Sequence, residues 1–179
     1  MPILTDKDII SWAIRGGIRP FWLSHVNAAS IDLCTGNQWL DLETNKITKS
    51  EIFIIYPRTL QTDIYNMLAD HFHFQRKCVA LLATTHEYIT LPDDMAAEVK
   101  LKTTPSRKGL GHPIADWVDP GFYGELTLML HAIRPIILKY GQPICQLVLH
   151  KLDKSVAVSY KERGHYAGQV GPTRAWDTT

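Results

Sequence analysis

The sequence predicts a single, mainly β domain of the barrel or sandwich type. A chain of 179 residues suits one domain with a substantial core. Short β-branched or alternating apolar runs recur between residues 29 and 152. Turn-forming residues separate these runs, at Pro57, Pro92-Asp93-Asp94, Pro120-Gly121 and Gly141. Many short strands with regular turns favour a barrel or sandwich over a βαβ arrangement.

The chain is expected to open with a short helix. Thr5 or Asp6 can cap this helix, and Ile9, Ile10 and Ala13 recur at helical spacing before Gly16-Gly17 ends it. Strands are then expected at ASIDLCTG (29–36), EIFIIY (51–56), CVALLATT (78–85), EYITL (87–91), ELTLML (125–130), PIILKY (135–140) and ICQLVLHKL (144–152). LQTDIYNMLADHF (60–72) favours a further helix, and PDDMAAEV (92–99) favours a short helical turn after a proline.

The strand expected at 125–130 has two chemically different faces. Leu126, Leu128 and Leu130 form one face, which is fully apolar. The other face carries an acid, a hydroxyl and a thioether, from Glu125, Thr127 and Met129. The alternation predicts a half-buried strand and by itself gives Met129 no special role.

Composition excludes several classes of function. A hydrophobic content of 45%, a charged content of 21% and a net charge of +1 describe an ordinary globular protein, with no overall bias toward nucleic acid or acidic membranes. Cys34, Cys78 and Cys145 are odd in number and form no CxxC pair, so neither a disulfide framework nor a zinc knuckle is expected. MPILTDKDII does not resemble a signal peptide, and no apolar run approaches the roughly 20 residues of a membrane span. We therefore expect a cytoplasmic protein without nucleic-acid or membrane partners.

The segment KTTPSRKGLGHP (102–113) is the first candidate for chemistry. Lys102, Arg107 and Lys108 stand among hydroxyl groups and glycines, a combination that suits a polyphosphate, although no Walker motif is present. The alternative is a solvated loop. Asp119, before Pro120-Gly121, either caps the turn or presents its carboxylate to a sugar hydroxyl or a water molecule.

Two other groups of polar residues are candidate sites. His71 and His73, with His86-Glu87, lack the spacing of metal ligands, so no metal held by the protein is expected. The segment from Ser159 onward is polar and rich in glycine, which is typical of a frayed terminus. However, this segment is unusually rich in ring and amide side chains for a frayed terminus: Tyr160, His165, Tyr166 and Gln169.

Taken in order, these segments resemble the dCTP deaminase branch of the trimeric dUTPase-like superfamily. The resemblance is carried by ILTDKDI…GGI with ASIDLCTG, by the block from CVALLATT to SRKGLG, by VDPGFYGELTLML, by GQPICQLVL and by the tail pattern Y-x(5)-Y-x-x-Q. It implies a distorted jelly-roll β-barrel over residues 1–158 and a C-terminal lid over 159–179. It also implies a homotrimer with sites between subunits, a deoxynucleoside triphosphate as ligand, and Mg²⁺ carried in by the triphosphate.

The resemblance also assigns roles to residues. Arg107, Thr103 and Asp119 match catalytic positions, of which Asp119 binds the deoxyribose 3′-hydroxyl and Thr103 replaces a serine. Lys102 replaces the loop's first arginine and so loses the bidentate fork. The remaining substrate-binding positions are Thr104, Lys108, Phe122 under the sugar, and Tyr160, His165, Tyr166 and Gln169 in the tail, where His165 replaces a lysine. The catalytic glutamate of the deaminases corresponds to Met129, which is expected to bind substrate beside the base.

Met129 changes the expected reaction. Methionine cannot accept and return a proton, and loss of a general base commonly costs about 10²–10⁴ in rate. Glu125 shares the face but lies roughly 13 Å along the strand. We therefore expect a deoxynucleoside triphosphate diphosphatase, with dUTP as the first and dCTP as the second candidate substrate. The alternatives are a dCTP deaminase with a displaced general base and a catalytically inactive nucleotide-binding or regulatory protein.

Overall fold

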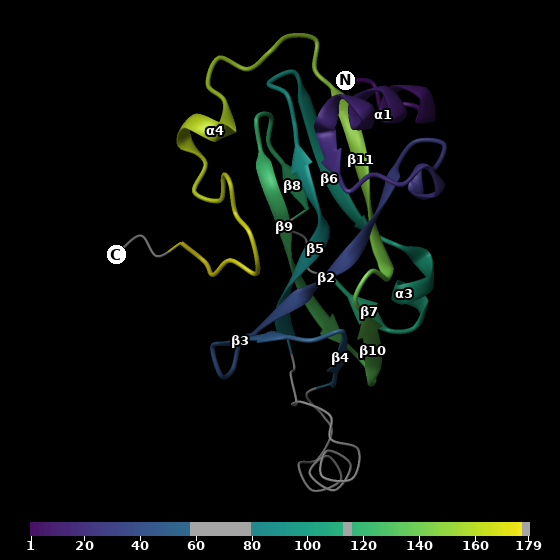
Figure 1. The fold of residues 1–179 in the computed structure, drawn as a ribbon, viewed down its shortest axis with the longest axis vertical. Coiled ribbons are helices and arrows are strands. Elements are labelled where there is room, and N and C mark those ends of the chain that lie inside the picture. Colours follow the sequence, from purple (N-terminus) through teal and green to yellow (C-terminus); the bar gives the residue numbers. More distant parts are fainter. Residues whose placement is uncertain (58–79, 113–115, 177–179) are drawn as a thin grey trace, which may run out of the picture.

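A computed structural model describes residues 1–57, 80–112 and 116–176 of the chain. These residues form a curled antiparallel sheet with strand order β7-β9-β5-β2-β11-β6-β8, while β1 pairs with β5 and β3 with β2 (Figure 1). A separate ribbon joins β4 to β10. The mainly β, distorted jelly-roll fold is thereby confirmed. The predicted helix at 60–72, and His71 and His73, lie outside the described residues.

The strands have the following bounds: β1 Ile18–Arg19, β2 Ile31–Asp41, β3 Lys46–Lys49, β4 Ile52–Ile55, β5 Ala80–Thr90, β6 Met95–Leu101, β7 Leu110–Gly111, β8 Trp117–Val118, β9 Tyr123–Ala132, β10 Ile136–Lys139 and β11 Pro143–Lys151. The helical segments are α1 Asp6–Trp12, η1 Ala13–Gly17, η2 Leu23–His25, α3 Thr103–Arg107 and α4 Tyr160–Arg163. None of the helices in these described ranges is long and apolar enough to cross a membrane.

Helix α1 forms where the sequence predicts it. Thr5 is the N-cap residue, and the Asp8 carboxylate accepts hydrogen bonds from its backbone N–H and its hydroxyl, at 3.2 and 2.8 Å. Ile9 and Trp12 are buried, and the Trp12 indole donates to the Thr90 carbonyl at 3.1 Å. Gly17 is required there, because a Cβ atom would lie 2.1 Å from the Trp12 ring. These contacts fix the helix against β5.

The long strand β2 lies at the centre of the curled sheet. Its first residues, Ile31 to Cys34, pair with β11, and the residues from Thr35 onward pair with β5. A register shift between Thr35 and Trp39 accompanies this change of partner. Trp39 is fully buried and stacks on Phe53 of β4, with ring centroids 5.0 Å apart. One strand thus belongs to both halves of the barrel, and the core lies between them.

Two sequence predictions are wrong at β5 and β6. The predicted break at His86 is a bulge within one strand, where the Thr85 hydroxyl donates to the Glu87 carbonyl and accepts from Leu126 N–H. The predicted helical turn at 92–99 is mostly strand β6, because it pairs along β11 and buries Ala96 and Ala97 completely. Pairing with a distant strand overrides the local helix preference of this segment. Thr103–Arg107, predicted as loop, forms the short helix α3.

Candidate functional site

Strand β9 separates the core from a candidate ligand pocket. Leu126, Leu128 and Leu130 are at most 7% exposed, as the alternation predicts. On the opposite face Met129 is 40% exposed, while Glu125 and Thr127 are partly covered. The covering segment is the C-terminal tail, which lies beside β9 in Figure 1.

The tail runs along β9 as an irregular parallel partner. A parallel bridge joins Gly124 to Gln169, Glu125 N–H donates to the Gln169 carbonyl at 2.9 Å, and the Gln169 amide donates to the Glu125 carbonyl at 2.6 Å. Farther along, Gly171 N–H donates to the Glu125 carboxylate at 2.8 Å, and Thr173 N–H donates to the Thr127 hydroxyl at 3.2 Å. The side chains of Glu125 and Thr127 therefore hold two alternate amides of the tail, those of Gly171 and Thr173.

A cavity of about 560 Å³ lies at the end of this contact. Its walls combine β9, the segment around β8 and the tail, and among its lining residues are Leu82, His112, Asp116, Trp117, Asp119, Phe122, Met129, Tyr160, Tyr166, Gln169 and Ala175. Six predicted site residues thus meet in one pocket: Asp119, Phe122, Met129, Tyr160, Tyr166 and Gln169. The pocket offers an apolar wall with polar groups at its rim, as small-molecule sites commonly do.

Asp119 and the aromatic residues around it are positioned by local contacts. The Trp117 indole donates to the Asp119 carboxylate at 3.0 Å, which fixes one oxygen of an otherwise exposed side chain. Phe122 is 5% exposed and packs against Tyr160, with ring centroids 5.9 Å apart. Burial raises the pKa of the Tyr160 phenol. The site therefore holds a carboxylate acceptor beside neutral aromatic rings.

His112 lies in the same pocket as Met129, and sequence reasoning did not single it out as a site residue. Burial lowers the pKa of His112. The nearby Asp116 carboxylate raises this pKa and so opposes the effect of burial, whereas His131 lowers it further. The imidazole is thus neutral at physiological pH and can accept a proton. Asp116 is paired with Lys100 at 2.8 Å, and this pairing lowers the pKa of its carboxyl group. Because Lys100 holds the Asp116 carboxylate, the His112 imidazole is the candidate proton acceptor of this pocket.

The predicted phosphate-binding residues do not line this pocket. Thr103, Thr104, Arg107 and Lys108 belong to α3 or its C-cap and are exposed, on another part of the molecule (Figure 1). Lys102 is half-buried and forms an ion pair with the Asp32 carboxylate. One chain therefore presents the pocket and the cationic helix as two separate surfaces.

The polar groups of the tail are largely used within the chain. The Tyr166 hydroxyl accepts a hydrogen bond from Trp176 N–H at 2.9 Å. His165 stacks on the Trp176 ring, with centroids 4.7 Å apart, and does not line the pocket. Trp117 and Ala175 contribute to the pocket without having been predicted. No pattern in the sequence points to Ala175, because its position depends on the two-residue register between the tail and β9.

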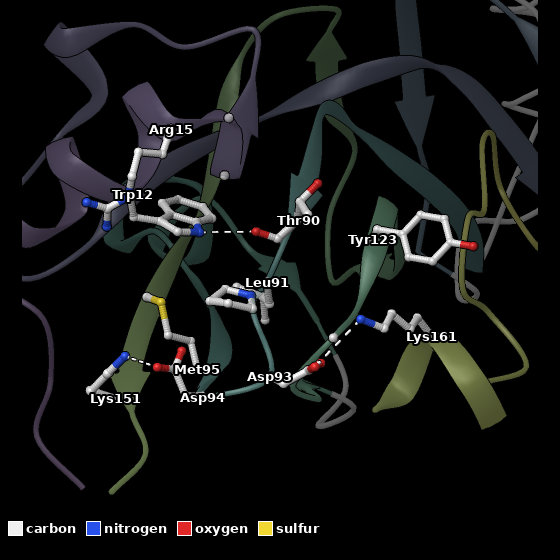
Figure 2. A pocket seen from close by; sticks show the side chains of 14 residues that line it. Trp12, Arg15, Thr90, Leu91, Asp93, Asp94, Met95, Tyr123, Lys151 and Lys161 are labelled. Atoms are coloured by element: carbon white, nitrogen blue, oxygen red, sulfur yellow. Dashed lines mark hydrogen bonds and ion pairs between the residues drawn. The ribbon is translucent and has the colours of Figure 1, made fainter. Parts of the chain in front are cut away.

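A second hollow, of about 640 Å³, lies beside α1 (Figure 2). Trp12, Arg15, Asp93, Tyr123 and Lys161 are among the residues that line it. Its lysines face its own carboxylates: Lys161 lies 3.6 Å from Asp93, and Lys151 is paired with Asp94. None of the predicted site residues lines this hollow, so the pocket at β9 is the better candidate.

Comparison with known proteins identifies the family. A family model described as dCTP deaminase-like matches residues 3–152. The chain belongs to the dCTP deaminase-like family. The "dCTP deaminase, dUMP-forming" of Aquifex aeolicus is 36% identical over 174 residues, covering 94% of this chain and 91% of the relative. That of Streptomyces griseus is 34% identical over 182 residues, covering 96% and 93%.

A solved structure supports the fold of this dCTP deaminase-like protein. The 2'-deoxycytidine 5'-triphosphate deaminase from Agrobacterium tumefaciens superposes with a TM-score of 0.63 at 17% identity, covering 83% of this chain and 47% of the other. The family places the chain among proteins of nucleotide metabolism. The names of the relatives favour a deaminase, the alternative weighed above, over the diphosphatase that the sequence led us to expect.

Proposed function

We propose that this protein converts dCTP to dUMP. In this proposal His112 transfers the proton during deamination, because the Met129 side chain has no group that can do so. The observation that supports the proposal most directly is the single pocket that joins Asp119, Phe122, Met129 and His112. The relatives' names supply the substrate, dCTP, and the product, dUMP. Such a conversion comprises loss of ammonia from the base and release of diphosphate.

The deamination step needs a base that takes a proton from water. Water attacks C4 of cytosine while the neutral imidazole of His112 accepts its proton, and the imidazolium then returns that proton to the departing amine. The balance is dCTP plus water giving dUTP plus ammonia. Asp119 accepts a hydrogen bond from the deoxyribose 3′-hydroxyl, and the Phe122 ring packs under the sugar. Met129 contributes an apolar contact beside the base.

Release of diphosphate needs cations around the triphosphate. Among the described residues that line the pocket, Arg174 carries a cation, and its guanidinium already donates to the Asn45 side chain and carbonyl. We propose that α3 of a second copy supplies Arg107 and Lys108, in a homotrimer with sites between subunits. The exposure of α3 and its separation from the pocket support this arrangement. Mg²⁺ bound to phosphate and water oxygens fits, because Asp116 and Asp119 at the pocket are already held by Lys100 and Trp117. When bound, the metal neutralises charge on the phosphates.

Met129 favours a second candidate, diphosphate release without deamination. A thioether offers no titratable proton, and the side chain stands 40% exposed in the pocket wall. If His112 does not reach the attacking water, only the phosphate chemistry remains, with dUTP or dCTP as substrate. A catalytically inactive nucleotide-binding protein is the third outcome.

One experiment separates these functions. The purified protein is incubated with dCTP or dUTP and Mg²⁺, and nucleotides, ammonia and pyrophosphate are measured. Ammonia and dUMP from dCTP support the lead proposal; dCMP with pyrophosphate, or turnover of dUTP alone, supports the second. Binding without turnover indicates the inactive protein. His112→Gln should abolish ammonia release, whereas His86→Gln, a half-buried histidine outside the pocket, should not.

A further inference from the structure

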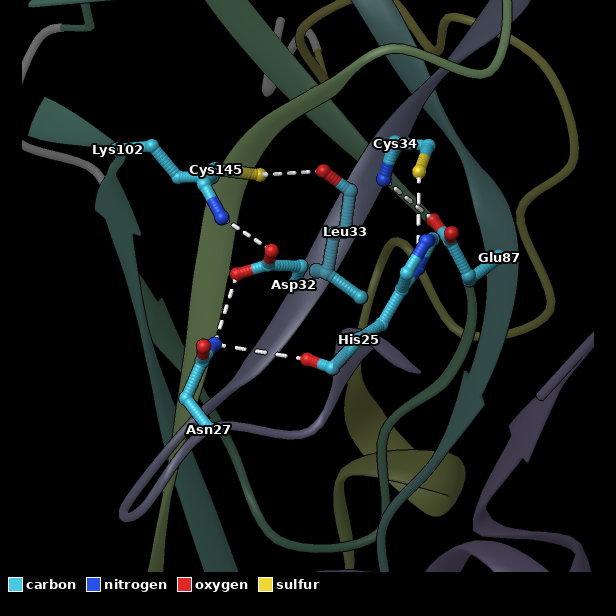
Figure 3. A network of polar contacts seen from close by, with 8 residues as sticks. All are labelled: His25, Asn27, Asp32, Leu33, Cys34, Glu87, Lys102 and Cys145. Atoms are coloured by element: carbon cyan, nitrogen blue, oxygen red, sulfur yellow. Dashed lines mark hydrogen bonds and ion pairs between the residues drawn. The ribbon is translucent and has the colours of Figure 1, made fainter. Parts of the chain in front are cut away.

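A group of metal-ligand side chains lies away from the nucleotide pocket and has no part in the proposed function. It consists of His25 at the end of η2, Cys34 in β2 and Glu87 in β5 (Figure 3). One ligand atom from each, the histidine nitrogen, the cysteine sulfur and a carboxylate oxygen, lies within 4.8 Å of the other two. Cys34 and Glu87 are buried, and His25 is half-buried. We call these three residues the His-Cys-Glu cluster.

The fold brings the cluster together through strand pairing. β2 pairs with β5, and the bulge between Thr84 and Tyr88 places the Glu87 side chain in the interior, where it is 1% exposed. The Cys34 backbone N–H donates to Glu87 Oε2 at 2.9 Å. The second oxygen, Oε1, is buried and has no hydrogen-bond partner among the described residues. An ionised carboxylate oxygen that is buried without a partner is costly, so Oε1 is suited to bind a metal ion.

The distance between the sulfur and the nitrogen is close to that in a tetrahedral transition-metal site. Cys34 Sγ lies 3.9 Å from His25 Nδ1. At the usual Zn–S and Zn–N bond lengths, a tetrahedral site places its sulfur and nitrogen about 3.6 Å apart. A movement of a few tenths of an ångström closes this difference, and a half-buried histidine can make it. We propose that the His-Cys-Glu cluster is a zinc site, with Cys34 Sγ, His25 Nδ1 and Glu87 Oε1 as ligands.

The donor set selects zinc over the alkaline-earth cations. Thiolate and imidazole are ligands of borderline and soft metals, whereas Mg²⁺ and Ca²⁺ take oxygen ligands. Three protein ligands leave a fourth position for water. Neighbouring groups hold the cluster in place: Trp22 packs against the His25 ring at 5.1 Å, and the Asn27 amide donates to the His25 carbonyl at 3.5 Å and to Asp32 at 2.9 Å. The first contact packs against the His25 ring, and the second holds the backbone of the short turn that carries it.

A neutral, metal-free cluster is the competing interpretation. Burial raises the pKa of the Glu87 carboxyl to about 7 and that of the Cys34 thiol to about 12. Without metal, both groups can therefore keep protons, and a protonated Glu87 needs no cation. Zinc would displace these protons, because thiolate and carboxylate are the ligating forms. Metal binding measured directly distinguishes the two.

The test uses the full chain and no nucleotide, so its outcome is independent of the proposed activity. Protein stripped with a chelator is titrated with Zn²⁺ by calorimetry, and with Co²⁺ by absorption spectroscopy. We expect one metal per chain and a thiolate-to-Co²⁺ charge-transfer band. Loss of an outer contact typically lowers metal affinity 10–100-fold, so loss of a ligand should lower it by more than about 100-fold.

Cys34→Ser should lose the charge-transfer band and the affinity. Cys145→Ser is the matched control, because Cys145 is also buried but lies outside the cluster, and it should change neither. His25→Gln alters a half-buried side chain in a short turn and keeps the test valid if Cys34→Ser does not fold. The proposal is wrong if wild-type protein binds neither metal, if Co²⁺ binds without a thiolate band, or if His25→Gln binds as wild type does.

Discussion

Glu125→Ala should release part of the C-terminal tail from β9. The Glu125 carboxylate accepts the Gly171 N–H at 2.8 Å, and a hydrogen bond to a charged group contributes about 1.5–3 kcal/mol. Because Glu125 is only half-buried, the lower end of this range applies. A loss of about 1.5 kcal/mol shifts the equilibrium between closed and open tail roughly tenfold.

Hydrogen exchange at individual tail amides measures this shift. The Gly171 amide should exchange about tenfold faster in Glu125→Ala, whereas Glu125→Gln keeps an acceptor and should show a smaller change. Thr127→Val is the matched change one step along the strand, and it should affect the Thr173 amide first. Unchanged exchange at Gly171 in Glu125→Ala would refute the proposed role of this carboxylate.

Three further predictions concern single side chains. Met129→Glu should create or raise dCTP deamination, by about 10²–10⁴ if base catalysis limits the rate, measured as ammonia released; no gain would mean that the base pocket has diverged beyond this position. If His112 is the base, deamination should rise with pH through a pKa below the ordinary histidine value of 6.5, and a limb above that value would contradict its assignment. In the metal-free folded chain, burial raises the pKa of Glu87 from 4.5 to about 7. Between pH 4.5 and pH 7, the folded chain therefore keeps a proton on Glu87 that the unfolded chain has lost. Stability should therefore fall by about 3 kcal/mol as pH rises from 4.5 to 7. The free energy of unfolding is measured by denaturant titration at several pH values, and Glu87→Gln should remove its fall with pH. The same pH dependence in Glu87→Gln and wild type would refute the role of Glu87.

The sequence predicted the strands best where a single face is buried. The alternation of Leu126, Leu128 and Leu130 with polar residues is a local signal, and the structure buries those leucines. The prediction for residues 92–99 was wrong because the conformation of this segment is set by a distant partner. It pairs with β11, some fifty residues later in the chain. No local pattern contains that information.

The site was predictable only in part, for reasons of distance in the chain. Resemblance to the family directed attention to Asp119, Phe122 and the tail aromatics, which share a pocket. Composition gave no indication of the His-Cys-Glu cluster, because a strand bulge and a short turn bring its members together from three separate segments. Metal sites with short, regular ligand spacing are visible in a sequence, whereas this one depends on tertiary structure.

The change from polar to apolar along β9 now has a physical explanation. Glu125 and Thr127 bind the amides of Gly171 and Thr173, so strand and tail advance together by two residues. The next side chain on this face of the strand is Met129, which shares the pocket with Ala175. None of the tail's hydrogen bonds described above uses the Met129 side chain. Binding of the tail to β9 therefore does not depend on the residue at position 129, whose side chain lines the pocket. A carboxylate introduced there should therefore change the chemistry of the pocket while leaving closure of the tail intact, and the exchange rate of the Gly171 amide in Met129→Glu provides the check.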